Sequence, residues 1–263
     1  MTITIDHRTT SAVPTTPVHA VGAGSAGELD ATVTDRRRAA IVAGVGYVAL
    51  FVLGIFANFV VREGLVVADD PTATATNITE SLGLFRIGLF SFLAVFLIDV
   101  VVAWALYVLF RSQHRDLSLV SAWFRIVYTV FMGVAAVFFF QALNLYESPY
   151  LAEAMSEAQR NAQALAGLEL FNSAWLIGLA AFGVHLVVMG ALVTRSTEAP
   201  RVLGYLMMLA GLAYVIDTSA NTLLADYDTY AGAFLAMVAI PSVIAEGWFG
   251  LWLLTKAGKP AVR

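Results

Sequence analysis

The sequence contains no cysteine and few charged residues, and both features narrow what the protein can be. Without cysteine there can be no disulfide, no thiolate metal site, no iron–sulfur cluster and no cysteine nucleophile. Charged residues make up 13% of the 263 residues, whereas a soluble domain carries about 25%. A chain with so little charge cannot cover a globular surface with solvated groups, so most of its exterior must face something other than water.

Long apolar runs take the place of the missing charge. Hydrophobic residues make up 59% of the chain, and the mean hydropathy is +0.78. An apolar run of about 20 residues is long enough to cross the hydrocarbon of a bilayer as a helix. We therefore predict an all-α fold, an integral membrane bundle of six transmembrane helices. The predicted spans cover residues 39–61, 86–110, 120–144, 170–193, 202–224 and 231–255.

The composition divides the chain into three segments. Residues 1–37 are rich in Thr, Ala, Pro and Gly without a helical apolar period, which predicts a disordered cytoplasmic tail. Residues 38–258 are predicted to form the six-helix transmembrane domain, and residues 259–263 a short cytoplasmic end. Gly22, Gly24 and Gly27 have the spacing of a dinucleotide-binding loop, but no strand precedes them and no helical face follows. We assign no cofactor and no resident metal.

The connection between the third and fourth spans carries a helical pattern of its own. Ser148 followed by Pro149 is typical of the cap and first residue of a helix. Apolar residues up to position 165 then recur on one face, with Glu153, Glu157 and Arg160 opposite. The pattern predicts an extra amphipathic helix in this outside loop. It would either pack on the bundle or cover an outward cavity as a lid.

Lysine and arginine are unequally divided between the two sets of loops, and this predicts the orientation. With the N-terminus in the cytoplasm, twelve of these residues fall on the cytoplasmic side and three, Arg62, Arg86 and Arg160, fall outside. Both termini are therefore predicted to be cytoplasmic. A net charge of −4 does not favour a nucleic-acid partner. The predicted partner is the lipid bilayer, and a homo-oligomer or a membrane partner protein stays open.

Several short segments resemble one family of membrane proteins. Together they resemble a bacterial multi-pass family known as domain of unknown function 4386, over roughly residues 36–258. The resemblance implies a multi-pass fold in a prokaryotic plasma membrane, and it implies no activity. The segments are Phe85–Arg86–Ile87 leading to Asp99 and Ala105–Leu106–Tyr107, the runs 199–205 and 210–217, and Glu246 before Leu251–Trp252–Leu253–Leu254.

Four ionisable residues lie well inside the predicted spans. They are Asp99, His185, Asp217 and Glu246, on the second, fourth, fifth and sixth spans. A charge at the centre of a bilayer costs about 2.5–3.5 kcal/mol on insertion scales. Asp99, His185 and Glu246 each precede a basic residue at the cytoplasmic end of their helix by 10 to 12 residues, which predicts a similar depth for all three. Such residues indicate either a functional site or hydrogen bonds between helices that only stabilise packing.

The fifth span carries a polar stripe. Tyr214, Asp217, Thr218 and Asn221 recur at three- and four-residue intervals, so they lie on one face of the helix. Lipid does not tolerate such a stripe. We therefore expect this face to be turned toward the bundle or toward water.

The sixth span combines an acid with a predicted kink. Ser242 and Glu246 share a face one turn apart, and Pro241 cannot donate a hydrogen bond to the carbonyl of Met237. A freed carbonyl beside an acid indicates a ligand or proton site. Arg125, near the start of the third span, is expected either to extend to the interface or to pair with an acid.

Three classes of function are compatible with these residues. The first is a small-solute, lipid or proton-linked binding or transport protein, with a cavity lined by the stripe of the fifth span and by Glu246. The second is a non-catalytic scaffold or sensory subunit whose buried groups serve packing. The third is an intramembrane metal-dependent hydrolase in which His185, Asp99 and Glu246 hold the metal, although no second histidine accompanies His185 at a ligand spacing. We rank the first class highest, and no ligand is identified.

Overall fold

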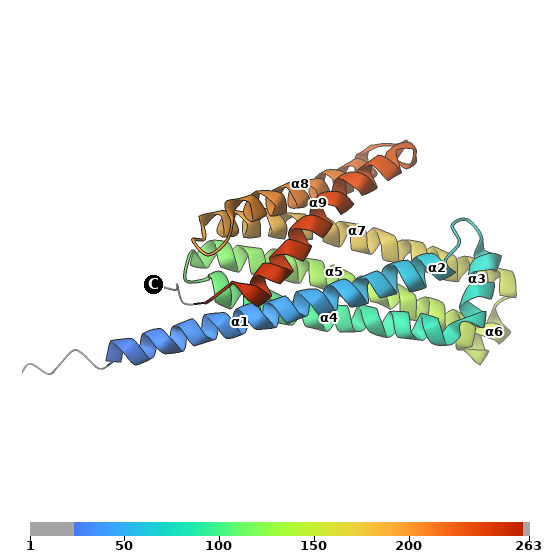
Figure 1. The fold of residues 1–263 in the computed structure, drawn as a ribbon. Helices are drawn as coiled ribbons and strands as arrows, with labels where there is room; N and C mark the ends of the chain where they lie inside the picture. Colours follow the sequence, from blue (N-terminus) through green and yellow to red (C-terminus); the bar gives the residue numbers. More distant parts are fainter. Residues whose placement is uncertain (1–23, 260–263) are drawn as a thin grey trace, which may run out of the picture.

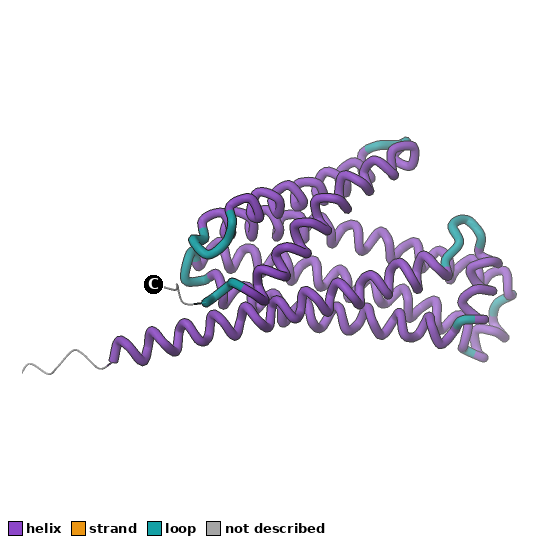
Figure 2. Tube along the Cα trace, in the orientation of Figure 1, coloured by secondary structure: helices purple, strands orange, loops and turns teal. Residues whose placement is uncertain are grey.

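The computed structural model describes residues 24–259, which form helices joined by short connections (Figures 1 and 2). No strand occurs within these residues. The helices are α1 (Gly24–Ile55), the π-helical segment η1 (Phe56–Arg62), α2 (Glu63–Leu65), α3 (Pro71–Glu80), α4 (Leu82–Phe110), α5 (Arg115–Glu147), α6 (Pro149–Ala154), α7 (Glu157–Arg195), α8 (Arg201–Leu223) and α9 (Tyr227–Thr255).

Six of these helical segments are long and apolar enough to cross a membrane. They are α1 with η1 and α2, then α4, α5, α7, α8 and α9, and they confirm the predicted all-α membrane bundle. Most ends of the predicted spans lie within about a turn and a half of the observed helix ends. The exceptions are the starts of α1 and α7, which extend well beyond the predicted spans.

α1 begins at Gly24, inside the segment 1–37 that we predicted to be a disordered tail. Between Gly24 and Arg38 the sequence contains alanine, glutamate, leucine and arginine, which are all good helix formers. The helix of the first span can therefore continue toward the N-terminus without an apolar face. Residues 1–23 and 260–263 lie outside the described residues, and for them the tail prediction stays a prediction.

The connection between α5 and α7 is helical, but it differs from the single amphipathic helix that we predicted. The side chain of Ser148 caps α6 as expected, with Pro149 as the first residue. α6 is only six residues long. Ser156 and Gln159 then form a capping box that starts α7, which runs without interruption into the fourth span. The second half of the predicted surface helix is thus the first part of a spanning helix.

The connection between α2 and α4 contains α3, which the sequence analysis did not predict. The carboxylate of Asp70 accepts hydrogen bonds from the backbone N–H groups of Thr72 and Ala73, and Pro71 is the first helical residue. An aspartate before a proline is a typical helix start, so the signal was present.

The six spans pack as a ring in the order of the chain. Each span packs on its neighbours in the chain, and α9 returns to pack on α1. We call the end where α1 begins and α9 ends the proximal end, and the end with α3, α6 and the α8–α9 connection the distal end (Figure 1). Toward the distal end, α8 and α9 leave the other spans as a hairpin (Figure 1). The buried apolar cluster of the distal half accordingly contains none of the described residues of α8 or α9.

Glycines hold α7 and α8 close together. Gly183 and Gly190 of α7 are seven residues apart, as are Gly204 and Gly211 of α8. A Cβ atom placed on Gly190 would lie 2.5 Å from the carbonyl oxygen of Gly204, and one on Gly183 would lie 2.5 Å from that of Gly211. The absence of side chains therefore lets the two backbones touch, as in other closely packed membrane helices.

Candidate functional site

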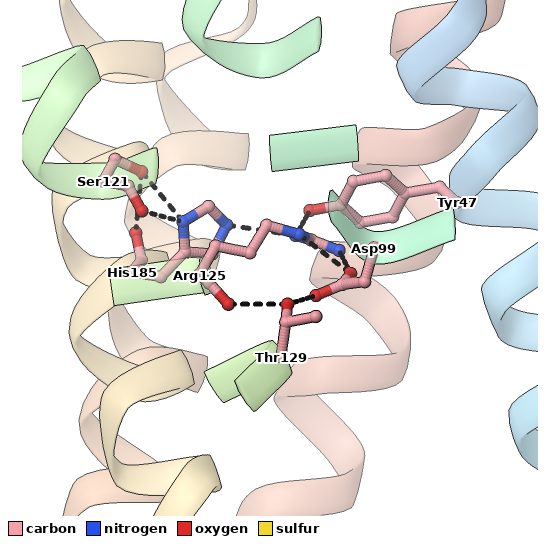
Figure 3. A network of polar contacts seen from close by, with 6 residues as sticks. All are labelled: Tyr47, Asp99, Ser121, Arg125, Thr129 and His185. Atoms are coloured by element: carbon pink, nitrogen blue, oxygen red, sulfur yellow. Dashed lines mark hydrogen bonds and ion pairs between the residues drawn. The ribbon is translucent and has the colours of Figure 1, made fainter. Parts of the chain in front are cut away.

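Arg125 of α5 lies in the centre of the ring, and its side chain is almost fully buried. The Nε and Nη2 atoms of its guanidinium group donate to Oδ1 of Asp99 on α4 at 3.0 and 2.5 Å (Figure 3). Nη1 donates to the hydroxyl of Tyr47 on α1 at 2.9 Å and to Nε2 of His185 on α7 at 3.1 Å. One arginine thus joins side chains from four spans. We call Tyr47, Asp99, Ser121, Arg125, Thr129 and His185 the Arg125 cluster.

His185 is held in one neutral form by its contacts. Its Nε2 accepts the hydrogen bond from Arg125, so this nitrogen carries no proton. Its Nδ1 lies 2.9 Å from the backbone carbonyl oxygen of Ser121, which can only accept, so we assign the ring proton to Nδ1. The hydroxyl of Ser121 lies at 2.9 Å from the same nitrogen. The imidazole therefore serves as an acceptor for Arg125.

Asp99 balances the charge of Arg125. It is 2% exposed, and its second carboxylate oxygen accepts a hydrogen bond from Thr129 at 2.5 Å. The guanidinium carbon also lies 4.9 Å from the ring centre of Tyr47 and 5.4 Å from that of Phe182, within the range of cation–π attraction. With one arginine, one aspartate and a neutral histidine, the Arg125 cluster carries no net charge.

Three further polar side chains lie next to this cluster, on α8 and α9. Tyr214 of α8 lies beside both Ser242 and Glu246 of α9, and Glu246 is near enough to Arg125 and Asp99 to interact with their charges. Ser242 is only 4% exposed, yet its hydroxyl has no hydrogen-bond partner among the described residues. Glu246 is half-buried and takes part in none of the ion pairs formed by the described residues. We call Tyr214, Ser242 and Glu246 the α8–α9 site.

The structure therefore separates the predicted site residues into three groups. Asp99, His185 and Arg125 are brought together in one cluster, and Tyr214, Ser242 and Glu246 lie beside it. Asp217 and Asn221 lie farther along α8 toward the distal end. Asp217 accepts a hydrogen bond from the hydroxyl of Tyr227 at 2.7 Å, and Asn221 is exposed.

The metal site considered in the sequence analysis is not formed. Arg125 lies between Asp99 and His185 and takes the acceptor atoms that a metal would need. Among residues 35–259, whose side chains are described, no three His, Asp or Glu side chains come together in a metal-binding arrangement. This geometry gives no support to an intramembrane metal-dependent hydrolase.

Three members of the Arg125 cluster were not predicted from the sequence: Tyr47, Ser121 and Thr129. Ser121 and Thr129 stand four residues before and after Arg125, so the three side chains form a polar line on one face of an apolar helix. This spacing was a usable signal. Tyr47 lies alone in an apolar run, and nothing in the sequence distinguishes it from a packing residue.

The proximal end of α9 is fixed to α1 and to the α7–α8 connection. The guanidinium group of Arg37 donates to three backbone carbonyls at the end of α9 at 2.5–3.1 Å. Arg36 forms an ion pair with Glu198 at 2.8 Å, and Glu198 also accepts a hydrogen bond from a backbone N–H just after α9. An arginine at the C-terminal carbonyls stabilises a helix end. The ring is therefore closed tightly at this end.

Comparisons with known proteins identify relatives but no activity. The family model described as "Domain of unknown function (DUF4386)" matches residues 42–257. An "Uncharacterized protein" from Archaeoglobus fulgidus is 29% identical over 174 residues, which cover 65% of this chain and 86% of that protein. No solved structure matches the chain. The function has to be argued from the geometry of the site.

Proposed function

The chain belongs to the family described as "Domain of unknown function (DUF4386)", and because this description assigns no activity we propose a function from the membrane domain itself. We propose that the protein binds a small polar or charged solute at the α8–α9 site, as the binding step of transport across the membrane. The observation that supports this is the buried hydroxyl of Ser242, which has no partner among the described residues.

An unpartnered buried polar group is costly for a membrane protein. Leaving one hydroxyl unpaired costs about 1–3 kcal/mol, and the great majority of buried polar groups in proteins are paired. The neighbouring Arg125 cluster follows this rule, since Asp99, Thr129 and His185 all have partners there. A solute that donates to or accepts from Ser242, and that neutralises Glu246, would remove the cost in the α8–α9 site.

The arrangement of the helices favours access from the distal side. α9 touches α1 in its proximal half, where Phe249 packs edge-on against Tyr47 at 5.4 Å between ring centres. Ser242 and Glu246 precede Phe249 along α9, so they lie on the distal side of this contact. Toward the distal end, α8 and α9 leave the other spans (Figure 1). We propose a plasma-membrane location with both termini cytoplasmic, as the twelve-to-three division of basic residues favours. The distal side would then be the outside.

A non-catalytic scaffold is the second candidate, and a specific observation favours it. The Arg125 cluster is almost completely paired within the protein and ties four spans together without any ligand. Buried polar groups of this kind often serve packing alone. The two candidates differ in what they require at Ser242. A scaffold needs no aqueous route to this side chain, whereas a binding protein does.

Cysteine labelling can decide between them, because the natural chain has no cysteine. The Ser242→Cys variant would be treated with a charged, membrane-impermeant methanethiosulfonate reagent in vesicles or micelles. We expect a reaction, because a solute site must be reachable from water. Ser112→Cys, in an exposed turn, is the reactive control, and Ser91→Cys, buried in α4, is the unreactive control. If Ser242→Cys reacts no faster than Ser91→Cys, the binding proposal is wrong and the scaffold is favoured.

A further inference from the structure

We propose that the α8–α9 site binds a monovalent metal cation such as Na+, which is coordinated by Glu246 and Ser242. This inference rests on the proposed binding function and names the class of ligand. It is carried by the charge balance in the centre of the ring and by the chemistry of the free ligand atoms.

The charge balance leaves room for one positive charge. The pair Arg125–Asp99 is neutral, and His185 is neutral because its two nitrogens accept from Arg125 and donate to a backbone carbonyl. An ionised Glu246 therefore gives the centre of the ring one uncompensated negative charge. The titratable groups near Glu246 on the surrounding spans are Tyr47, Asp99, Arg125, Tyr128 and Tyr214.

A monovalent guest fits this balance better than a divalent one. An uncompensated charge inside a membrane protein is unfavourable, and a single positive charge removes it. A divalent ion would leave the centre positive, and sites for such ions usually provide several carboxylates or other oxygen ligands. Glu246 is the one carboxylate of the α8–α9 site, and Asp99 is already engaged by Arg125 and Thr129.

The free ligand atoms are all oxygens. Glu246 offers a carboxylate, and Ser242 and Tyr214 offer hydroxyls. Oxygen ligands select hard cations rather than transition metals. A proton alone would neutralise Glu246 but would leave the hydroxyl of Ser242 without a partner. A metal cation can bind both oxygens at once.

The Arg125 cluster argues against an anion as the guest. Four of the five N–H donors of its guanidinium group are directed at Asp99, Tyr47 and His185. An anion would have to displace Asp99 from Arg125, and it would lie beside the negative charge of Glu246. The cluster therefore acts as a neutral, fixed wall next to the cation site.

Thermal unfolding can test the cation site, followed through the five tryptophans of the chain. The purified protein would be melted in a mildly alkaline buffer with increasing NaCl, with choline chloride keeping the ionic strength constant. We expect a saturable rise in Tm with Na+, since a ligand that binds the folded state stabilises it. Radioactive sodium retained by the protein would measure binding directly.

Two variants and one matched control complete the test. Ser242→Ala removes an oxygen that has no partner, so it should fold normally, and both this variant and Glu246→Gln should lose the Na+-dependent rise in Tm. Asp217→Asn changes a half-buried carboxylate on α8 outside the site and should keep the rise. A Tm that does not change with Na+ would overturn the proposal, as would an Na+ effect that survives in both variants. If Ser242→Cys is labelled but Na+ has no effect, the cation is wrong and the binding function stands.

Discussion

Breaking the Arg125–Asp99 pair from its two sides should destabilise the protein to different extents. In Asp99→Asn, Arg125 keeps its charge, because a guanidinium group does not lose its proton inside proteins. Its remaining hydrogen-bond partners, Tyr47 and His185, would both be neutral, and Glu246 would be the acid left near it. In Arg125→Met, Asp99 is left with Thr129, but a carboxylate can become neutral by taking up a proton. We therefore expect Asp99→Asn to be the more destabilising variant.

The magnitude follows from the burial of the pair. Both side chains are 2–3% exposed, and removing one partner of a buried ion pair costs about 3–5 kcal/mol. The cost of about 2.5–3.5 kcal/mol for a charge at the centre of a bilayer is of the same order. We expect about 3–5 kcal/mol for Asp99→Asn and about 1–3 kcal/mol for Arg125→Met, where only unpaired hydrogen-bonding groups remain. The double variant Asp99→Leu/Arg125→Met contains neither charge and should recover part of the loss.

Equilibrium unfolding in mixed micelles with a rising fraction of denaturing detergent would measure these free energies through tryptophan fluorescence. Arg86→Gln is the matched control, because it breaks the exposed ion pair Arg86–Glu147 and should leave the unfolding curve unchanged. The reasoning is refuted if Asp99→Asn costs only the roughly 0.6 kcal/mol typical of a hydrogen-bonded pair between membrane helices. It is also refuted if Arg125→Met is the more damaging single variant.

Three further predictions concern packing, the proximal end and the orientation. Gly190→Ala should cost about 1–3 kcal/mol in the same unfolding assay, because its Cβ would clash with the backbone of α8. The control is Gly54→Ala, which faces open space and should not lower the free energy of unfolding. Equal losses in both variants would contradict the close contact between α7 and α8. Arg37→Gln should speed amide hydrogen exchange in the last turn of α9, whereas Arg38→Gln, at an exposed residue, should not. Unchanged exchange in both variants would show that the contacts of Arg37 do not hold the proximal end of α9. A charged thiol reagent should label Ser112→Cys only from the cytoplasmic side of sealed vesicles, and labelling from outside would reverse the predicted orientation.

The number of spans could be predicted from the sequence because it depends on sums over many residues. An apolar run of the required length inserts as a helix almost regardless of the order of its side chains. Helix starts were harder, since residues from Glu157 onward were predicted to belong to a separate surface helix, and the segment before Arg38 to a disordered tail. Local capping by Ser156 and ordinary helix propensity determined the outcome in these segments.

The partners of the buried charges could be predicted only in part. The similar depth of Asp99 and His185 was correctly inferred from their distance to the helix ends, and the structure brings both to Arg125. The rotation of each helix about its axis could not be inferred, because a span that is apolar all round has no distinct buried face. Asp217 and Asn221 were grouped with Tyr214 because they share its face, but they lie farther toward the distal end of α8, where Asp217 pairs with Tyr227.

The Arg125 cluster and the α8–α9 site differ in how the helices around them pack. The Arg125 cluster is held by the first four spans, whose residues also build the apolar cluster of the distal half. Ser242 and Glu246 belong to α9, which packs on α8 and on the proximal part of α1, and which contains Pro241. A binding site needs helices that hold some of its ligand atoms in place, and one element that can move to admit or enclose the ligand. The first four spans keep their geometry. We expect the part of α9 on the distal side of Pro241 to move.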